Sequence, residues 1–232
     1  MNDQFNGFDA DFWHFFHDLK QNNTREWFAD NKTRYQEKVV APVSAFISAI
    51  APRLRDISPH YNADPRPNKG SMFRIYRDVR FSKDKKPYKE HAAAQFRHRM
   101  GKDAHAPGFY VHLEADNILY GGGIWTPPSD ALRQIRDRIV SKPEKWQAVI
   151  EDKALLEQFG GIRGDSLKRP PRDFSADAPH MTDLKRKSFF AMKTLQKSDI
   201  VGTAAFVDEV INSFEAAVPL MYFISDAVNV EF

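Results

Sequence analysis

The chain has 232 residues, of which 42% are apolar, 13% aromatic and 28% charged. These proportions are those of an ordinary globular protein, so disorder, a collagen-like repeat and a low-complexity scaffold are excluded as its main description. The lack of cysteine excludes a disulfide framework, a thiolate metal site and a cysteine nucleophile. No stretch reaches the roughly 18 uninterrupted apolar residues of a membrane-spanning helix, and the N-terminus lacks a secretory signal pattern. We therefore expect a soluble, cytoplasmic protein with no membrane partner.

The positive charge is unevenly distributed along the chain. The formal net charge is +3, yet residues 66–105 hold twelve Lys and Arg against four Asp and Glu, so this segment carries +8 and the rest carries −5. Such asymmetry predicts a surface that attracts anions. The alternative is a solvated loop whose charges are neutralised by partners elsewhere in the fold.

The first sixty residues have the apolar spacing of helices. Phe12, Phe15 and Leu19 recur at spacings of three and four, and Asn22 ends this segment before a second helix begins near Thr24. The third helix has the clearest stripe, with Pro42 in its first turn. That stripe consists of Val39, Val40, Val43, Phe46, Ile47, Ile50, Leu54 and Ile57.

A sheet is predicted after the loop at 58–70. Residues 92–99, 108–115 and 117–125 are expected to be extended, and the middle segment alternates apolar and polar residues as a half-buried strand does. Asp116 and Asn117 suit a tight turn between two antiparallel strands. The three glycines at 121–123 predict either a bulge or the close approach of another segment.

The second half of the chain is expected to be mainly helical. A helix begins after Thr126-Pro127-Pro128, and shorter helices are predicted at 143–151 and 153–159. Residues 160–177 should be irregular and 187–195 a further strand, and a last helix should run from a Ser198 cap until Pro219 breaks it. We expect one α+β domain spanning 1–232, with a small antiparallel sheet packed between N-terminal and C-terminal helices.

A charged motif starts at Arg74 and reads RIYRDVRFSKDKKPY. It resembles the signature RxxRDxRFxxx[DN]KxxY of the bacterial DUF2461 family, also called TIGR02453. The corresponding residues are Arg74, Arg77, Asp78, Arg80, Phe81, Asp84, Lys85 and Tyr88, with two residues instead of three between Phe81 and Asp84. NNTREWF at 22–28, GGGIWTPP at 121–128 and KRPPRDF at 168–174 resemble the same family. The resemblance covers nearly the whole chain, and it implies no particular activity.

Read physically, the motif predicts an anion site. Arginine carries a permanent charge and a planar fork that binds phosphate or carboxylate oxygens in pairs. Arg74, Arg77 and Asp78 share a face if the segment is helical, whereas Arg74, Asp78 and Arg80 share one if it is extended. In both cases Asp78 can orient an arginine. The alternative is a structural Arg–Asp network without a ligand, in which Arg77 is buried against Asp78.

These observations give a list of candidate site residues. The partner is expected to be an anionic small molecule held by Arg74, Arg77, Arg80, Lys85 and Tyr88, to which the family resemblance adds Arg172 and Lys187. If the protein is an enzyme, the catalytic candidates are Asp78, Asp84 and Tyr88. We also expect residues 74–89 and 168–172 to lie on the same side of the sheet and to form one positive surface.

A metal site and a cofactor are not predicted. His112, Glu114 and Asp116 alternate on one strand face, but such an alternation is more typical of the polar side of a strand. His91 and His98 receive the same interpretation, and His14 and His17 lie three apart in an aromatic-rich helix. The glycines lack the pattern of a phosphate-binding loop, and no serine has the context of a nucleophile.

Two further classes of function remain open. Aromatic residues interleaved with Lys and Arg are typical of single-strand nucleic-acid platforms, and here they are Tyr76, Phe81, Tyr88 and Phe96. An interaction or structural domain with no chemistry is the third possibility. An open basic groove would indicate nucleic acid, whereas a fully paired arginine network would indicate a structural role.

Overall fold

A computed structural model describes residues 4–101, 106–195 and 199–232. Its centre is a four-stranded sheet in the order β1-β2-β3-β4, in which all neighbouring strands are antiparallel. The strands are β1 (Ala92–Arg97), β2 (Gly108–Glu114), β3 (Asn117–Ile124) and β4 (Phe189–Leu195). The predicted α+β class and the antiparallel pairing of 108–115 with 117–125 are confirmed.

The N-terminal helices begin and end close to the predicted positions. The Asp9 carboxylate caps the first helix by accepting from the backbone N–H of Phe12 at 2.9 Å, and the Thr24 hydroxyl caps the second by accepting from that of Trp27 at 3.3 Å. This region comprises α1 (Ala10–Gln21), α2 (Arg25–Asp30), α3 (Lys32–Tyr35), a π-helical turn η1 (Gln36–Val40) and α4 (Ala41–Ile57).

The later helices match the expectation up to residue 159 and differ after residue 195. The predicted cap, Ser198, lies outside the described residues. The single final helix is wrong: two helices replace it, and Pro219 lies in the first turn of the second, where its missing N–H would have no partner in any case. The elements are α5 (Ser129–Ser141), α6 (Pro143–Ile150), α7 (Lys153–Phe159), α8 (Met181–Leu184), a 3₁₀ turn η2 (Asp199–Gly202), α9 (Phe206–Ala216) and α10 (Val218–Ala227).

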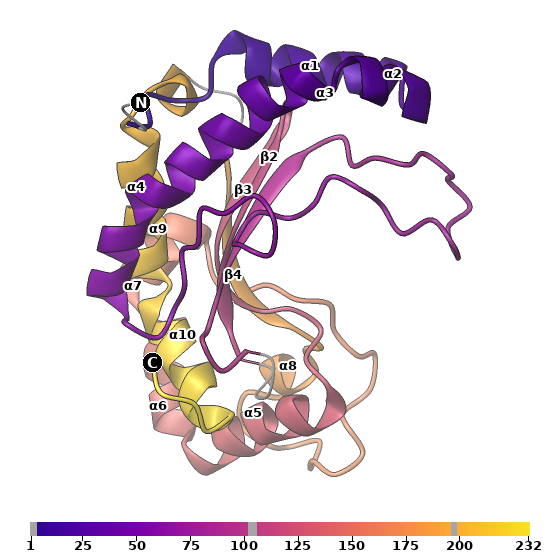
Figure 1. The fold of residues 1–232 in the computed structure, drawn as a ribbon. Helices are drawn as coiled ribbons and strands as arrows, with labels where there is room; N and C mark the ends of the chain where they lie inside the picture. Colours follow the sequence, from indigo (N-terminus) through magenta and orange to yellow (C-terminus); the bar gives the residue numbers. More distant parts are fainter. Residues whose placement is uncertain (1–3, 102–105, 196–198) are drawn as a thin grey trace.

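One face of the sheet is covered by helices (Figure 1). Helices α9 and α10 pack against β3, and α4 lies against α9. Phe109, Val111 and Leu113 point to this side and are buried, as predicted, and the Phe109 ring stacks on Phe214 of α9 at a centroid distance of 4.6 Å. The hydrophobic core therefore lies between the sheet and these helices.

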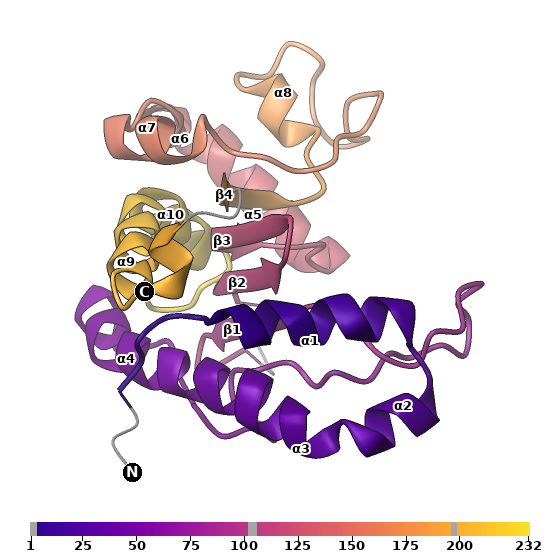
Figure 2. The same ribbon diagram turned by 90° about the horizontal axis from the view of Figure 1, so that it is seen from above.

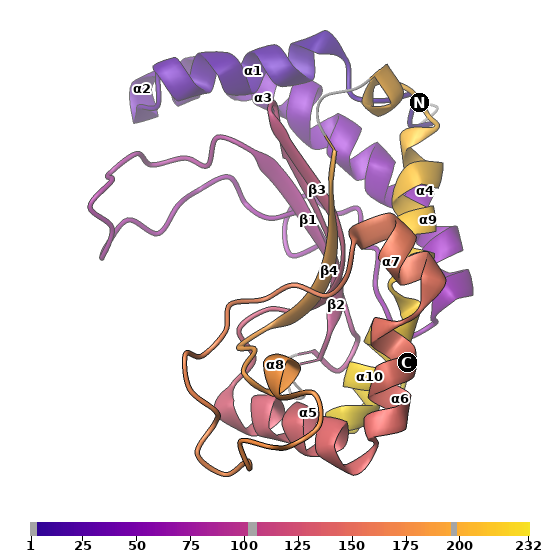
Figure 3. The same cartoon turned by 180° about the vertical axis from the view of Figure 1, so that it is seen from behind.

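In the part of the chain that the structure describes, no helix covers the opposite face, which we call the open face (Figures 1 and 3). The strand register brings to this face Gln95, Tyr110, His112, Glu114, Leu119, Phe190 and Met192, and their side chains are partly buried. Seen from above in Figure 2, residues 74–90 flank the β1 edge and residues 160–177 flank the β4 edge. Both segments project on the side of the open face.

Residues 74–90, which we call the arm, form an irregular extension of the sheet. The segment before the arm runs beside β1, because the Phe73 N–H donates to the Ala93 carbonyl at 2.9 Å and the Gln95 N–H to that of Ser71 at 2.9 Å. The pairing continues into the arm, where the Arg77 N–H donates to the Pro87 carbonyl at 2.9 Å. Residues 78–86 form the arm tip.

Residues 121–123 pair in regular register with both neighbouring strands, so β3 has no bulge at the three glycines. Of the two predicted explanations, the close approach of another segment is the one that the structure shows. A Cβ built on Gly121 would lie 2.0 Å from the carbonyl oxygen of Ala191 on β4. Only glycine fits here. None of the helices in the described residues is long and apolar enough to cross a membrane.

Candidate functional site

At the arm tip, the arginines of the signature are paired with carboxylates of the same tip. Arg77 donates to Asp84 at 2.6 Å, and Arg80 donates to the Asp78 carboxylate from both Nε and Nη2, at 3.0 and 2.7 Å. These hydrogen bonds lower the pKa of both carboxyl groups below the usual range. The Arg80 side chain is 77% exposed, so its pair is solvated. Asp78 does orient an arginine, but that arginine is Arg80, and Arg77 is not buried against Asp78.

Two further signature side chains of this segment, Lys85 and Tyr88, make contacts within the fold. The Lys85 ammonium donates to the Val79 carbonyl at 3.0 Å and thereby closes the tip. Tyr88 is only 5% exposed, and its ring stacks on Phe28 of α2 at 4.1 Å. Burial raises the pKa of Tyr88, so its hydroxyl is neutral at pH 7. This position favours packing over contact with a ligand.

Asn23 fastens the arm to the N-terminal helices. Its amide accepts from the Tyr88 N–H and donates to the Tyr88 carbonyl, both at 3.1 Å, and it also donates to Glu90 at 2.9 Å. The NNTREWF segment, which contains Asn23, therefore contacts the arm that carries the charged signature. Both motifs were visible in the sequence, whereas their contact across 65 residues was not.

Arg172 and Lys187 lie apart from the arm. Arg172 is exposed in the segment along the β4 edge, and the backbone N–H of Lys187 donates to the Asp165 carbonyl at 2.7 Å. Within the described residues, no hydrogen bond or ion pair joins either side chain to the arm. The two basic segments thus border the open face from opposite edges (Figure 2).

At the base of the arm, Arg74, Lys89 and Arg97 form what we call the cation cluster. The Lys89 ammonium lies 5.4 Å and the Arg97 guanidinium carbon 5.9 Å from the centre of the Phe73 ring. Lys89 donates to the Arg74 carbonyl at 2.6 Å, and Arg97 donates to the Gln95 side-chain oxygen at 3.0 Å. Among the described residues, no carboxylate lies within ion-pair distance of these three cations.

The charges of the cation cluster act on one another. Burial lowers the pKa of Lys89, and the positive charge of Arg74 lowers it further. Arg74 also contributes to lowering the pKa of Asp78, whose oxygens are bonded to Arg80. The sequence did not single out Lys89 or Arg97, because only the pairing of 71–77 with 87–97 brings them to Phe73.

Beside the cation cluster, His91, His112 and Glu114 form a second group, the histidine cluster. The rings of His91 and His112 lie 4.2 Å apart, and His112 Nε2 is 3.2 Å from a Glu114 oxygen. Burial lowers the pKa of His91 to about 4, and the charge of a protonated His112 acts in the same direction. Asp116 is exposed in the following turn and does not join the group. The strand alternation placed His112 and Glu114 on one face, but it could not show that His91 meets them.

His98 has a different environment. It is only 3% exposed, and its Nε2 donates to the Glu231 carbonyl at 2.8 Å near the C-terminus. It stacks on His60 at 5.7 Å, on the side of the fold away from the histidine cluster. This arrangement is that of a histidine whose polar atoms are satisfied within the core.

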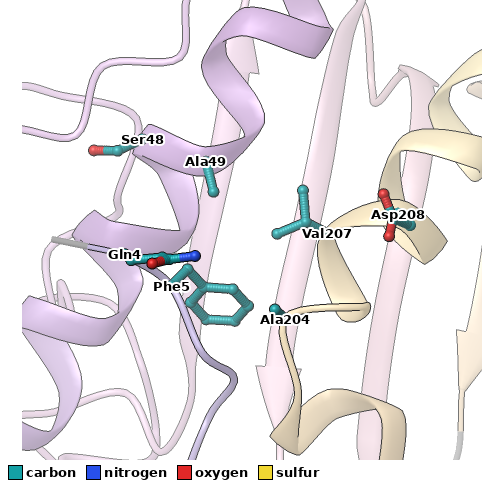
Figure 4. Close-up of a pocket in the computed structure, with 7 residues that line it drawn as sticks. All are labelled: Gln4, Phe5, Ser48, Ala49, Ala204, Val207 and Asp208. Atoms are coloured by element: carbon teal, nitrogen blue, oxygen red, sulfur yellow. The ribbon is translucent and has the colours of Figure 1, made fainter. Parts of the chain in front are cut away.

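A pocket of about 400 Å³ lies between the N-terminal segment, α4 and the start of α9 (Figure 4). Phe5, Ala49 and Val207 make much of its lining apolar. The one charged side chain in that lining, Asp208, is paired with Arg53. The lining offers no cation to an anionic ligand, so the candidate site remains on the open face.

Fold and site together define an α+β protein whose sheet is covered by helices on one face and bordered by basic segments on the other. The chain belongs to the family described as "Conserved hypothetical protein (DUF2461)", whose model matches residues 11–223. The resemblance of the chain to this family is thereby confirmed. No curated protein and no solved structure matches the chain.

Proposed function

We propose that this protein binds a small anionic ligand, bearing a phosphate or carboxylate group, at the cation cluster on the open face. The observation that carries the proposal is that Lys89 and Arg97 lie over the Phe73 ring and that the charge of Arg74 acts on Lys89. None of the three has a carboxylate partner among the described residues. Neighbouring cations repel one another, so an anion that binds between them relieves an electrostatic cost already present in the fold.

The neighbouring groups suit a ligand with an apolar or planar part. Phe73 and Tyr110 are 6.2 Å apart in an edge-on arrangement on the same face, and the Gln95 amide lies beside Arg97. The arginine forks supply bidentate contacts to oxygen, and Lys89 supplies a point charge. In this proposal Arg77, Arg80, Lys85, Arg172 and Lys187 contribute at longer range, through the positive potential along the edges of the open face.

Thermal shift with a panel of simple anions tests the proposal directly. The probes are inorganic phosphate, pyrophosphate and citrate, because a specific ligand raises the melting temperature as its concentration exceeds its dissociation constant. We expect at least one probe to raise the melting temperature of the wild type, and Arg97→Gln to reduce that shift strongly. Arg97→Lys should restore it only in part, because the planar fork is missing.

Arg80→Gln is the matched control, since it removes one positive charge from the arm tip, where Arg80 is paired with Asp78. It should leave the ligand-induced shift nearly unchanged. Equal losses in Arg80→Gln and Arg97→Gln would mean that the anions respond to general charge and not to the cation cluster. A wild type that responds to none of the probes would argue against the proposal.

A second candidate function is favoured by one observation at the arm tip. The Phe81 side chain is 96% exposed, and the Arg80 guanidinium lies 5.9 Å from its ring, among Lys83, Lys85 and Lys86. An exposed aromatic ring flanked by cations is suited to stacking on an unpaired base. Fluorescence anisotropy with a labelled single-stranded oligonucleotide tests this function, and Phe81→Ser should weaken binding if the ring stacks on a base. Binding that falls with salt but ignores Phe81→Ser would indicate only nonspecific charge attraction.

A further inference from the structure

The histidine cluster brings three potential metal ligands to one place on the open face. His112 and Glu114 alternate on β2, and His91 immediately precedes β1. Because Ala92 pairs with Leu113, His91 comes beside Glu114 across the two strands. One ligand atom from each residue lies within 4.8 Å of the others. His91 lies 21 residues before His112 in the sequence, so its meeting with the two β2 residues is a property of the fold.

The donor set suits a borderline divalent ion. Two imidazole nitrogens and one carboxylate oxygen are typical ligands of Zn²⁺, whereas Mg²⁺ and Ca²⁺ prefer oxygen ligands throughout. Bonds of about 2.0–2.2 Å at a tetrahedral angle place two donors about 3.3 Å apart. The separation of 3.2 Å between His112 Nε2 and the Glu114 oxygen agrees with that value.

Tyr110 supplies an outer contact that a metal-binding histidine needs. Its hydroxyl lies 3.2 Å from His112 Nδ1. If Nδ1 carries the proton and donates it to Tyr110, the lone pair of Nε2 points toward Glu114 and is available to an ion between them. Histidine ligands commonly donate their second ring N–H in this way, which sets the tautomer and the ring orientation.

Burial is graded across the cluster. The His112 side chain is 12% exposed and that of Glu114 is 38% exposed, so one side of the cluster is open to solvent. Charges of both signs surround it, since Lys89 and Glu90 directly precede His91 and Glu114 is itself a member of the cluster. An ion can therefore enter from the open face, and its own charge is offset by nearby carboxylates.

We propose that His91, His112 and Glu114 bind one divalent transition-metal ion of the Zn²⁺ class, with Tyr110 as a positioning residue. Three protein ligands leave a fourth coordination position for water or for another ligand. The competing arrangement is a hydrogen-bonded chain from Tyr110 through His112 to Glu114 that holds no metal. The proposal does not depend on anion binding at the cation cluster, because none of the three metal ligands belongs to that cluster; Tyr110 alone borders both sites.

The test is a Zn²⁺ titration of the full chain without a polyhistidine tag, after treatment with EDTA, in competition with a chromogenic chelator. We expect one tight site per chain. His91→Ala and His112→Ala should each weaken binding by about 100-fold or more, because the loss of a ligand costs at least as much as the loss of an outer contact. Tyr110→Phe should retain the stoichiometry and weaken binding by about 10- to 100-fold.

The double variant His14→Ala/His17→Ala is the matched control, since these histidines lie three apart on the exposed side of α1 and could hold an ion adventitiously. It should bind Zn²⁺ as the wild type does. Co²⁺ supplies a second readout, because its visible spectrum reports nitrogen ligation and low coordination number at the site. Circular dichroism of each metal-free variant checks the fold. If an alanine variant unfolds, Glu114→Gln replaces it as the variant that removes a ligand, because it keeps the side-chain shape.

Two outcomes would overturn the proposal. One is a wild type that binds Zn²⁺ no better than a variant lacking all three ligands, which would leave the hydrogen-bonded chain as the role of the cluster. The other is binding that disappears in the His14/His17 variant and persists in the His91 and His112 variants.

Discussion

At the scale of single residues, the environment of each arginine decides what it contributes. Arg77 pairs with Asp84, whose side chain is 54% exposed, whereas Arg186 donates at 2.8 Å to Asp183, whose side chain is only 12% exposed. Asp183 also accepts from the Trp146 indole at 2.9 Å inside the core. A solvated ion pair adds little to stability, but a buried carboxylate that loses its partner is costly.

We therefore expect Arg77→Ala and Arg186→Ala to differ in the free energy of unfolding. Arg77→Ala should cost less than about 1 kcal/mol, the range of exposed pairs. Arg186→Ala should cost about 3 kcal/mol, because it leaves Asp183 with the indole as its one remaining side-chain partner. Urea denaturation of both variants beside the wild type provides the measurement. A large loss in Arg77→Ala would revive the structural interpretation of the arm.

We expect His98 to make the stability of the protein depend on pH. Its Nδ1 accepts from the Met100 N–H at 3.1 Å and its Nε2 donates to the Glu231 carbonyl, so the folded state holds the neutral ring. Burial is the main cause that lowers the pKa of His98. His60 and Arg99 act in the same direction, and both the carbonyl and the carboxylate of Glu231 oppose them.

The sign of the effect follows from linkage. With the pKa of His98 lower in the folded state, the unfolded state binds more protons as the pH falls below about 6.5, and stability decreases. We expect His98→Gln to reduce the loss in unfolding free energy between pH 7.5 and pH 5, measured by urea denaturation. Other groups titrate in this range, so the comparison of the variant with the wild type is the test. An identical loss in both would show that His98 does not contribute.

The sequence predicted part of the candidate site at this scale. The signature named Arg74, which belongs to the proposed cation cluster, and it gave Asp78 an arginine to orient, because both properties depend on residues close in the chain. Lys89 and Arg97 were missed, since their approach to Phe73 depends on a strand register between distant segments. Periodicity within one segment cannot supply that register.

At the scale of elements, the sequence predicted a strand or a helix correctly where its apolar residues follow a single clear periodicity. The alternation in 108–115 and the apolar stripe before Ile57 correspond to β2 and α4. The prediction failed at Pro219, because proline is compatible both with the end of one helix and with the first turn of the next. It also left open whether 74–80 is helical or extended, and the structure shows an irregular segment with a single bridge between Tyr76 and Tyr88.

Alanine substitutions at two glycines, Gly121 in β3 and Gly160 after α7, should differ in their cost to stability. Gly121→Ala would place a Cβ 2.0 Å from the Ala191 carbonyl oxygen, so β3 and β4 must separate. We expect a loss of about 3 kcal/mol, at the upper end of overpacking costs. Gly160 has a φ of 68° at the end of α7 with open space around it, so Gly160→Ala should cost only about 1 kcal/mol. Thermal denaturation compares them, and equal costs would contradict a role for close strand approach.

At the scale of the whole molecule, the buried side chains connect the two ends of the chain. The hydrophobic cluster extends from Phe5 to Val228, and Phe46 of α4 stacks on Phe206 of α9 at 5.5 Å. The N-terminal helices, the sheet and the C-terminal helices therefore share contacts. That one domain spans 1–232 remains a prediction, and this connected core is the physical reason to expect it.

A single domain should unfold in one cooperative transition. The four tryptophans allow a sharp test. Trp13 is buried in α1, near the β1 edge of the sheet, and Trp146 is buried in α6, beyond the β4 edge (Figure 2). Trp27 and Trp125 are at least partly exposed. Two variants, each retaining only Trp13 or only Trp146 with the other tryptophans changed to phenylalanine, report the two regions separately. Within each variant the fluorescence midpoint in urea should coincide with the midpoint from circular dichroism. If Trp13 reports an earlier transition than the backbone signal, the N-terminal helices unfold as a separate unit, and the single-domain prediction is wrong.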